Sequence, residues 1–182
     1  MNATSDTLGA AGLEPAASDF ETLFEAHYEL TARAIARVIH DNGRAEELAV
    51  EAFLKLSRNP QAQGERAGGW LHRTAIRLAL DELRRRARRT RYESLFAWTG
   101  RPRTPDELFS VSQEQGRVRA VLASMNTRHA ELILLRHDGA GYDELASSLE
   151  IHPASVGTLL SRAQQAFRKE YIKRYGEPNV GQ

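Results

Sequence analysis

The chain has 182 residues, of which 41% are hydrophobic and 27% charged, and it contains no cysteine. This composition predicts a packed core, and it excludes a disulfide framework, a thiol nucleophile and a zinc site with cysteine ligands. No apolar run approaches the roughly 18 residues of a membrane span, and the first 17 residues contain no Lys or Arg, so no secretion signal is predicted. We therefore expect a cytoplasmic protein without membrane insertion.

The first half of the chain predicts three helices behind a flexible tail at residues 1–17. Ser18 and Glu21 have the spacing of a capping box, and apolar residues recur at helical intervals behind them. A polar, glycine-rich loop at 61–69 separates the second helix from the third, which begins near Trp70. We expect Trp70 to pack in the core, since a tryptophan that opens an amphipathic helix does so more often than it stacks on a base.

Charge is distributed unevenly along the chain, although the net charge is only +1. Residues 19–60 carry five basic and eight acidic side chains, whereas residues 70–91 carry eight arginines and two acidic side chains. A basic block of this kind contacts a polyanion or extends a helix into solvent. We favour phosphate binding, because the block contains arginine and no lysine. The candidate DNA-binding residues in this block are Arg73, Arg77, Arg84, Arg85 and Arg88.

The second half predicts another helical domain behind a linker. Residues 92–104 contain glycine and proline but no apolar period, so they are predicted to be the linker. The second domain is expected at 105–176, with a tail at 177–182. Its last helices have the layout of a helix-turn-helix, in which a short helix at 142–149 precedes a tight turn and a longer helix opened by Pro153. The alternative is an ordinary three-helix packing unit.

In a helix-turn-helix, the first turns of the second helix face the base edges in the major groove. Serine and threonine can bond to a base or a phosphate there, and arginine can read guanine through two hydrogen bonds. The candidate residues at these positions are His152, Ser155, Thr158 and Arg162.

Short motifs in both halves point to one family. In the second half they are Leu134–Gly139, Tyr142–Ala146 and the pair Arg162-Ala163. In the first half they are Ala45–Leu48, Phe53–Leu56 and, in the arginine-rich helix, Trp70-Leu71, Ala75, Asp81, Leu83 and Arg84. Through these motifs the chain resembles the sigma-70 family of bacterial RNA polymerase, in its extracytoplasmic-function branch. Residues 126–167 are similar to region 4 and the first half to region 2, in the order and separation of the family.

The resemblance implies an all-α protein of two small helical domains, at 19–91 and 105–176. It implies a transcription initiation factor whose partners are core RNA polymerase and promoter DNA, with an anti-sigma protein as a candidate third partner. The first domain would bind polymerase through Glu47, Val50, Glu51 and Leu54. It would also open the downstream (−10-type) promoter element, with the loop at 61–69 capturing a flipped base. The second domain would read the upstream (−35-type) element as duplex.

Four residues depart from the family pattern: Val50, Arg77, Gly157 and Leu159. Val50 stands where the family usually has glutamine, Arg77 where it has asparagine, and the other two where the recognition helix has basic residues. A glycine inside a helix costs about 1 kcal/mol relative to alanine, and an exposed leucine cannot contact phosphate. We therefore expect upstream recognition to be weak.

Two other functions are possible interpretations of the same sequence features. One is a degenerate sigma-like regulator that binds DNA or protein without initiating transcription, and the other is a helical adaptor whose arginines contact an acidic protein. None of these is an enzyme, and the sequence has no phosphate loop, nucleophile elbow or clustered acid–base set. No cofactor is expected, and the six histidines lack the spacing of a metal site.

Overall fold

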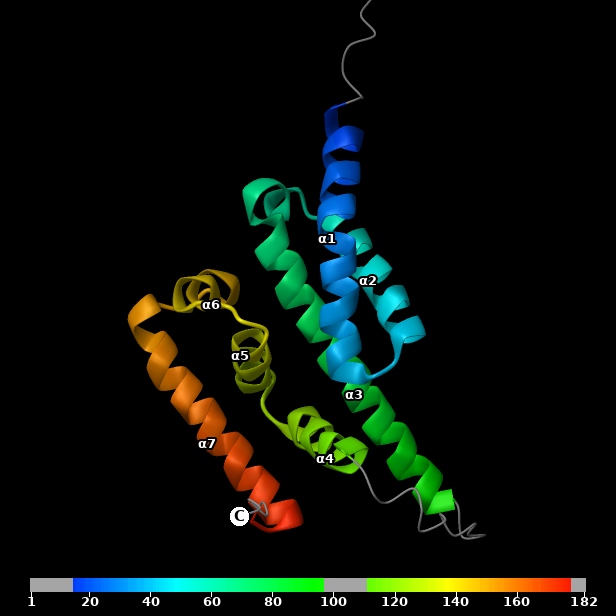
Figure 1. Ribbon diagram of the computed structural model, residues 1–182, viewed down its shortest axis with the longest axis vertical. Coiled ribbons are helices and arrows are strands. Elements are labelled where there is room, and N and C mark those ends of the chain that lie inside the picture. The colour runs from blue at the N-terminus through cyan, green and yellow to red at the C-terminus, as the bar shows by residue number, and fades with distance from the viewer. Residues whose placement is uncertain (1–14, 97–110, 178–182) are drawn as a thin grey trace, which may run out of the picture.

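The fold consists of helices and turns in the part of the chain that the computed structural model describes, residues 15–96 and 111–177 (Figure 1). The helices are α1 (Pro15–Ile39), α2 (Asn42–Ser57), α3 (Ala67–Phe96), α4 (Val111–Ser124), α5 (Thr127–His137), α6 (Tyr142–Leu149) and α7 (Val156–Tyr175). Short 3-10 turns occur at η1 (Pro60–Ala62), η2 (Gly64–Arg66) and η4 (Pro153–Ser155). The prediction of an all-α protein is confirmed. Among the helices described, none combines the length and apolar character needed to span a membrane.

Two predicted helix boundaries differ from the structure. Helix α1 begins at Pro15, so Ser18 lies within the helix and the predicted capping box at Ser18 is wrong. The proline explains the earlier start, because its fixed φ suits the first turn of a helix and its missing N–H is not needed there. Helix α3 continues to Phe96, past the predicted boundary at residue 91. The rest of the predicted linker, 97–104, lies outside the described residues.

A tight turn reverses the chain between α1 and α2. His40 takes the left-handed conformation, with φ of 54°, and Asp41 follows as the N-cap of α2. The Asp41 carboxylate accepts a hydrogen bond from the backbone N–H of Arg44 at 3.0 Å. Such a cap satisfies a donor that the first turn of a helix leaves without an intrahelical partner. The backbone hydrogen bond from Arg44 and the side-chain hydrogen bond from Arg86 lower the pKa of Asp41.

An aromatic cluster closes one end of the first half. Phe53 of α2 is almost fully buried, and its ring centroid lies 4.8 Å from that of Phe24 on α1. Phe24 also stacks on Tyr28 at 4.8 Å. Trp70, at the start of α3, is half-buried and packs against this cluster, in agreement with the core position expected for it.

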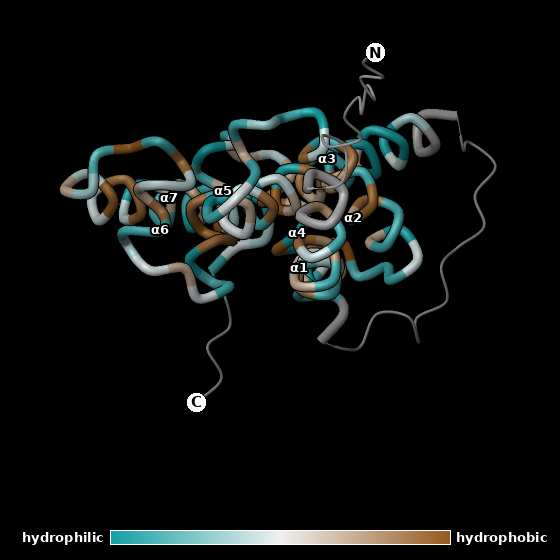
Figure 2. Tube along the Cα trace, turned by 90° about the horizontal axis from the view of Figure 1, so that it is seen from above, coloured by the Kyte–Doolittle hydropathy of each residue, from teal (hydrophilic) through white to brown (hydrophobic). Residues whose placement is uncertain are grey.

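The main hydrophobic cluster extends through both halves of the chain, with α3 in the middle (Figure 1). The buried residues that α3 contributes are Ala75, Ile76, Ala79, Leu80 and Leu83. Residues of α1 and α2 pack on one side of α3, and residues of α4, α5 and α6 on the other. Seen from above, hydrophobic segments gather between the helices of each half and around α3 (Figure 2). The two halves are therefore in contact along α3.

Candidate nucleic-acid interface

The arginines of α3 divide into two groups according to what they contact. Arg73, Arg77 and Arg84 meet partners in the second half of the chain. Arg85 and Arg88 lie exposed toward the C-terminal end of the helix. All five were predicted to bind DNA as one set, whereas the structure gives them different surroundings.

Arg73, Arg77 and Arg84 contact α5, the residues that end α4 and the turn after α6, although the Arg77 side chain remains 52% exposed. Arg77 forms an ion pair with Glu131 of α5, whose side chain is only 2% exposed. Arg73 Nη1 lies 3.5 Å from Glu150 Oε1. Arg84 donates hydrogen bonds to the backbone carbonyl oxygens of Ala123 and Met125, each at 3.2 Å. Each of these contacts occupies at least one guanidinium N–H that could otherwise donate to a phosphate.

Glu131 is a functional candidate that the sequence analysis did not identify. A buried carboxylate is unfavourable unless a cation or hydrogen-bond donors compensate it, and removing the partner of such a charge is strongly destabilising. Arg77 supplies that compensation. One feature of the sequence could have indicated a buried carboxylate at this position. Glu131 lies between Ala130 and Leu132, which are both fully buried. The unusual arginine at position 77 therefore has a structural partner.

A second contact between the halves surrounds Asp138, the residue that ends α5. Its Oδ2 lies 3.0 Å from His72 Nε2 on α3, and its Oδ1 lies 3.3 Å from Arg37 Nη1 on α1. The Asp138 side chain is almost fully buried. Helices α1 and α3 thus both engage the end of α5.

Another arginine of α3 holds the first half together. Arg86 donates to Glu82 at 3.0 Å, to Asp41 at 2.7 Å and to the carbonyl of Ile39 at 3.3 Å. Glu82 also lies 3.3 Å from Arg44. Burial raises the pKa of the Glu82 carboxyl, but hydrogen bonds from Arg86 and Arg44 together outweigh this effect, so the pKa lies below its usual value of 4.5. This network fixes the α1–α2 turn on α3.

The exposed end of α3 keeps a basic surface. The Arg85 side chain is 61% exposed and lies 3.3 Å from Glu82. Arg88 is exposed, and Tyr92 is exposed beyond it. This end of the helix extends past α1 and α2 (Figure 1). A helix end that carries arginines and an exposed aromatic ring can contact phosphates and stack on a base.

The predicted recognition helix presents most of its predicted residues to solvent. His152, Thr158 and Arg162 are exposed, and Ser155 is half-buried. The turn before α7 is tight: Glu150 takes a left-handed conformation with φ of 52°, and His152 Nδ1 accepts a hydrogen bond from the N–H of Ala154 at 3.2 Å.

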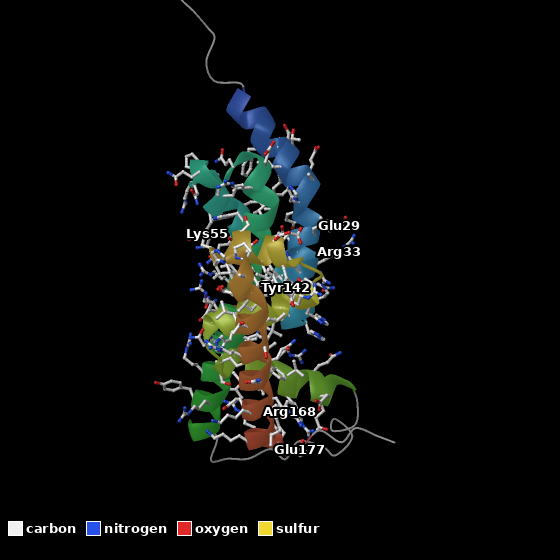
Figure 3. The ribbon with its side chains drawn as sticks, turned by 90° about the vertical axis from the view of Figure 1, so that its left-hand side faces the viewer. Glu29, Arg33, Lys55, Tyr142, Arg168 and Glu177 are labelled. Atoms are coloured by element: carbon white, nitrogen blue, oxygen red, sulfur yellow. The ribbon has the colours of Figure 1, made fainter. Side chains whose placement is uncertain are left out.

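Two departures from the family pattern in this helix have different surroundings. The expectation that Leu159 is exposed is wrong, because Leu159 is half-buried and packs against the main hydrophobic cluster. A Cβ added at Gly157 would lie 3.7 Å from the ring of Tyr142, which is an ordinary contact. Tyr142 is itself exposed (Figure 3), and the guanidinium of Arg136 lies 5.8 Å from its ring centroid. Position 157 therefore has room for a side chain, whereas the side chain at position 159 packs against the core cluster.

The residues predicted to bind polymerase share an exposed face of α2. Val50 is 44% exposed and Leu54 51%, which is unusual for apolar side chains of this size. Glu47 and Glu51 lie beside them and are also exposed, with Glu47 paired to Arg44 and Glu51 paired to Lys55 at 3.4 Å. An apolar centre flanked by acidic side chains suits a protein partner with a complementary basic rim.

A cleft of about 960 Å³ separates the loop at 59–70 from α5 and α6. The side formed by η2 and α3 includes Arg66, Trp70 and Arg73. Its opposite wall is acidic, with side chains of Asp138, Asp143, Glu144 and Glu150. The loop predicted to capture a flipped base therefore faces carboxylates in this arrangement.

Comparisons with known proteins support the region 2 resemblance. Residues 23–89 match the model of sigma-70 region 2. The chain is 28% identical over 174 residues to the ECF RNA polymerase sigma factor SigE of Mycolicibacterium smegmatis, covering 92% of this chain and 67% of that protein. It is also similar to the sigma factor RpoE of Bartonella quintana, in a structure with the anti-sigma factor NepR. That match has 15% identity and a TM-score of 0.49, and covers 84% of this chain and 96% of the other.

Helix α7 provides a test of the two departures. We expect Leu159→Arg to lower the free energy of unfolding by about 1–3 kcal/mol, because it places a charge against the core cluster. Gly157→Ala should raise stability by up to about 1 kcal/mol, because the helix loses a flexible residue and the new methyl group has room. Urea unfolding of both variants measures the difference. Equal stability of Leu159→Arg and the wild type would contradict the half-buried position of Leu159.

Glu82 predicts a dependence of stability on pH. Its lowered pKa means that the ionised carboxylate stabilises the fold at neutral pH and that this contribution is lost as the pH falls below about 4.5. The stability difference between the wild type and Glu82→Gln should therefore shrink on acidification from about pH 6 to about pH 3.5, as measured by urea unfolding. Glu29→Gln, in the exposed pair with Arg33, is the control and should show little difference at either pH. A constant difference for Glu82→Gln would mean that its carboxylate is not stabilised by these arginines.

Proposed function

We propose that this chain, a sigma-70 family protein through its region 2, is a transcription initiation factor that binds core RNA polymerase and directs it to promoter DNA. The observation that carries the proposal is the region 2 match, within which the predicted polymerase-binding residues share one exposed face of α2. Similarity to an extracytoplasmic-function sigma factor over most of the chain supports the same role. In this role the polymerase performs the chemistry, and the chain supplies promoter recognition.

Two surfaces are available for DNA. The exposed end of α3, with Arg85 and Arg88, would contact phosphates near the downstream element. The outer face of α7, with Thr158 and Arg162, would enter the major groove of the upstream element. Because positions 157 and 159 of α7 supply no donors, the downstream contacts would provide most of the affinity.

A sigma-like regulator that does not initiate transcription is the second candidate. The observation that favours it is that Arg73, Arg77 and Arg84 are engaged within the protein. Run-off transcription with core polymerase on a promoter library separates the two candidates. Transcripts that depend on the chain support the initiation factor, whereas binding of DNA or polymerase without any transcript favours the regulator.

Charge reversal tests the polymerase surface on α2. Glu47→Lys with Glu51→Lys should abolish co-purification with core polymerase and with it the transcript, because like charges would meet the basic rim of the partner. The matched control is Glu25→Lys with Glu29→Lys, which reverses two exposed charges on α1. Glu29 lies on the opposite side of the molecule from Lys55 of α2 (Figure 3). Helicity should be unchanged in both double variants. Normal co-purification of the α2 variant would then show that polymerase does not dock on this face of α2.

Replacing arginines of the two groups separately tests the DNA surface of α3. Arg85→Ala with Arg88→Ala should weaken binding to all DNA sequences and flatten its salt dependence, by about 0.7–0.9 in the log–log slope for each phosphate that the variant no longer neutralises. Arg84→Ala should mainly lower stability, because Arg84 donates to backbone carbonyls. Fluorescence anisotropy over a range of salt concentrations measures both variants. An unchanged slope for the double variant would show that the exposed end of α3 does not meet phosphates.

A further inference from the structure

One tyrosine differs from the others in its surroundings. Tyr92, near the C-terminal end of α3, is 66% exposed, the highest fraction among the large apolar side chains that the structure describes. The chain has five tyrosines, and each of the other four has a ring, a guanidinium or a carboxylate as its partner: Tyr28, Tyr142, Tyr171 and Tyr175. In residues 15–96 and 111–177, no ring or guanidinium lies over Tyr92. Tyr92 therefore presents its ring to solvent.

Tyr92 shares one face of α3 with two exposed arginines. Arg85, Arg88 and Tyr92 are spaced i, i+3 and i+7, and residues at these intervals lie on the same side of a helix. At about 1.5 Å per residue they extend over about 10 Å of the axis, the length of about three stacked nucleotides of one strand. One turn before Arg85 the face ends at Asp81, which pairs with Arg84 at 3.4 Å. We call Arg85, Arg88 and Tyr92 the α3 strip.

The α3 strip is far from the loop that was predicted to capture a flipped base. Trp70 follows that loop at the start of α3, and Tyr92 lies about 33 Å further along the same helix at about 1.5 Å per residue. The loop and the strip are at opposite ends of α3 (Figure 1). The carboxylates of α5 and α6 line the cleft beside the loop. A strand that follows the α3 strip would therefore not meet that acidic wall.

A guanidinium and an aromatic ring recognise different parts of a nucleic acid. Arginines neutralise the phosphates of a single strand and of a duplex alike. A tyrosine ring stacks on the face of a base, and this contact tolerates any sequence because every base has such a face. The bases of a duplex are stacked on one another, so an unpaired base is the partner that an exposed ring can reach. Arginines and a ring on one face therefore favour single-stranded DNA over duplex.

We propose that the α3 strip is a single-strand contact additional to the loop at 61–69, in which Tyr92 stacks on an unpaired base and Arg85 and Arg88 bind phosphates of the same strand. This inference rests on the proposed function, because it takes the exposed end of α3 to bind DNA. It adds a base to the phosphate contacts, and with the base a preference for an unpaired strand.

Substitution of the ring in the full chain tests the stacking contact. By fluorescence anisotropy with a labelled single-stranded oligothymidine, Tyr92→Ala should bind at least about fivefold more weakly than the wild type, the lower end of the contribution of one stacked base. Tyr92→Phe should bind like the wild type, because it keeps the ring. Leu30→Ala, which removes a similarly exposed apolar side chain from α1, is the matched control and should bind normally. The thermal unfolding midpoint should be the same in all three variants, because both positions are exposed.

Three further measurements separate stacking from charge. Binding of Tyr92→Ala to a duplex of the same length should equal that of the wild type. Over a range of salt concentrations, Tyr92→Ala should lower single-strand affinity by a constant factor, whereas Arg85→Ala with Arg88→Ala should flatten the slope. On an abasic oligonucleotide, which keeps the phosphates and lacks the bases, Tyr92→Ala and the wild type should bind equally.

The outcomes distinguish the stacking contact from the proposed function. Equal single-strand affinity of Tyr92→Ala and the wild type would overturn the stacking contact and leave the phosphate contacts of α3 intact. Binding of Tyr92→Phe as weak as that of Tyr92→Ala would also overturn it, as would an equal loss by Tyr92→Ala on the duplex or the abasic strand. If the wild type binds no single-stranded DNA at low salt, the stacking contact is wrong. If the double arginine variant also keeps the salt slope on duplex, the proposed DNA surface at the end of α3 is wrong as well.

Discussion

The burial of α3 between the two halves of the chain is the constraint on which the other features depend. Its Ala75, Ile76 and Ala79 have no exposed surface, and helices pack on both sides of it. Small residues allow neighbouring helices to approach closely, and the polar groups around the buried strip must then find partners within the protein. The ion pair of Arg77 with Glu131 and the hydrogen bonds of Arg84 to backbone carbonyls meet this requirement.

One residue type consequently has three roles along one helix. Arg86 joins the α1–α2 turn to α3, Arg77 joins the two halves, and Arg88 lies exposed toward the end of the helix. Arginine suits all three roles, because its planar group offers five donors and stays charged in a partly buried position. The charge of a segment therefore does not reveal how much of it is available to a partner. In this chain the availability of each arginine to a partner depends on which helix packs opposite it.

Local patterns in the sequence predicted much of the fold, and long-range packing accounts for most of the differences. Apolar residues at helical spacing predicted the helical class. The exposed positions on α2 came from the resemblance to the sigma-70 family, and those before and on α7 came from the helix-turn-helix layout. The partner of Arg77 could not be predicted, because Glu131 is 54 residues away and an acidic residue on a helix is usually solvated. Leu159 was misjudged for a related reason: the family pattern places a basic residue there, whereas this chain uses the position for packing.

The ion pair between Arg77 and Glu131 also limits how the two halves can vary during evolution. A neutral residue at 77 would leave the carboxylate of Glu131 buried without a cation, and a neutral residue at 131 would leave Arg77 without its partner. Changes at the two positions are therefore coupled, so a lineage that alters one is under selection to alter the other. The second half of a relative that lacks this carboxylate would be a poor replacement in a chimaera, even if its recognition helix read the same DNA.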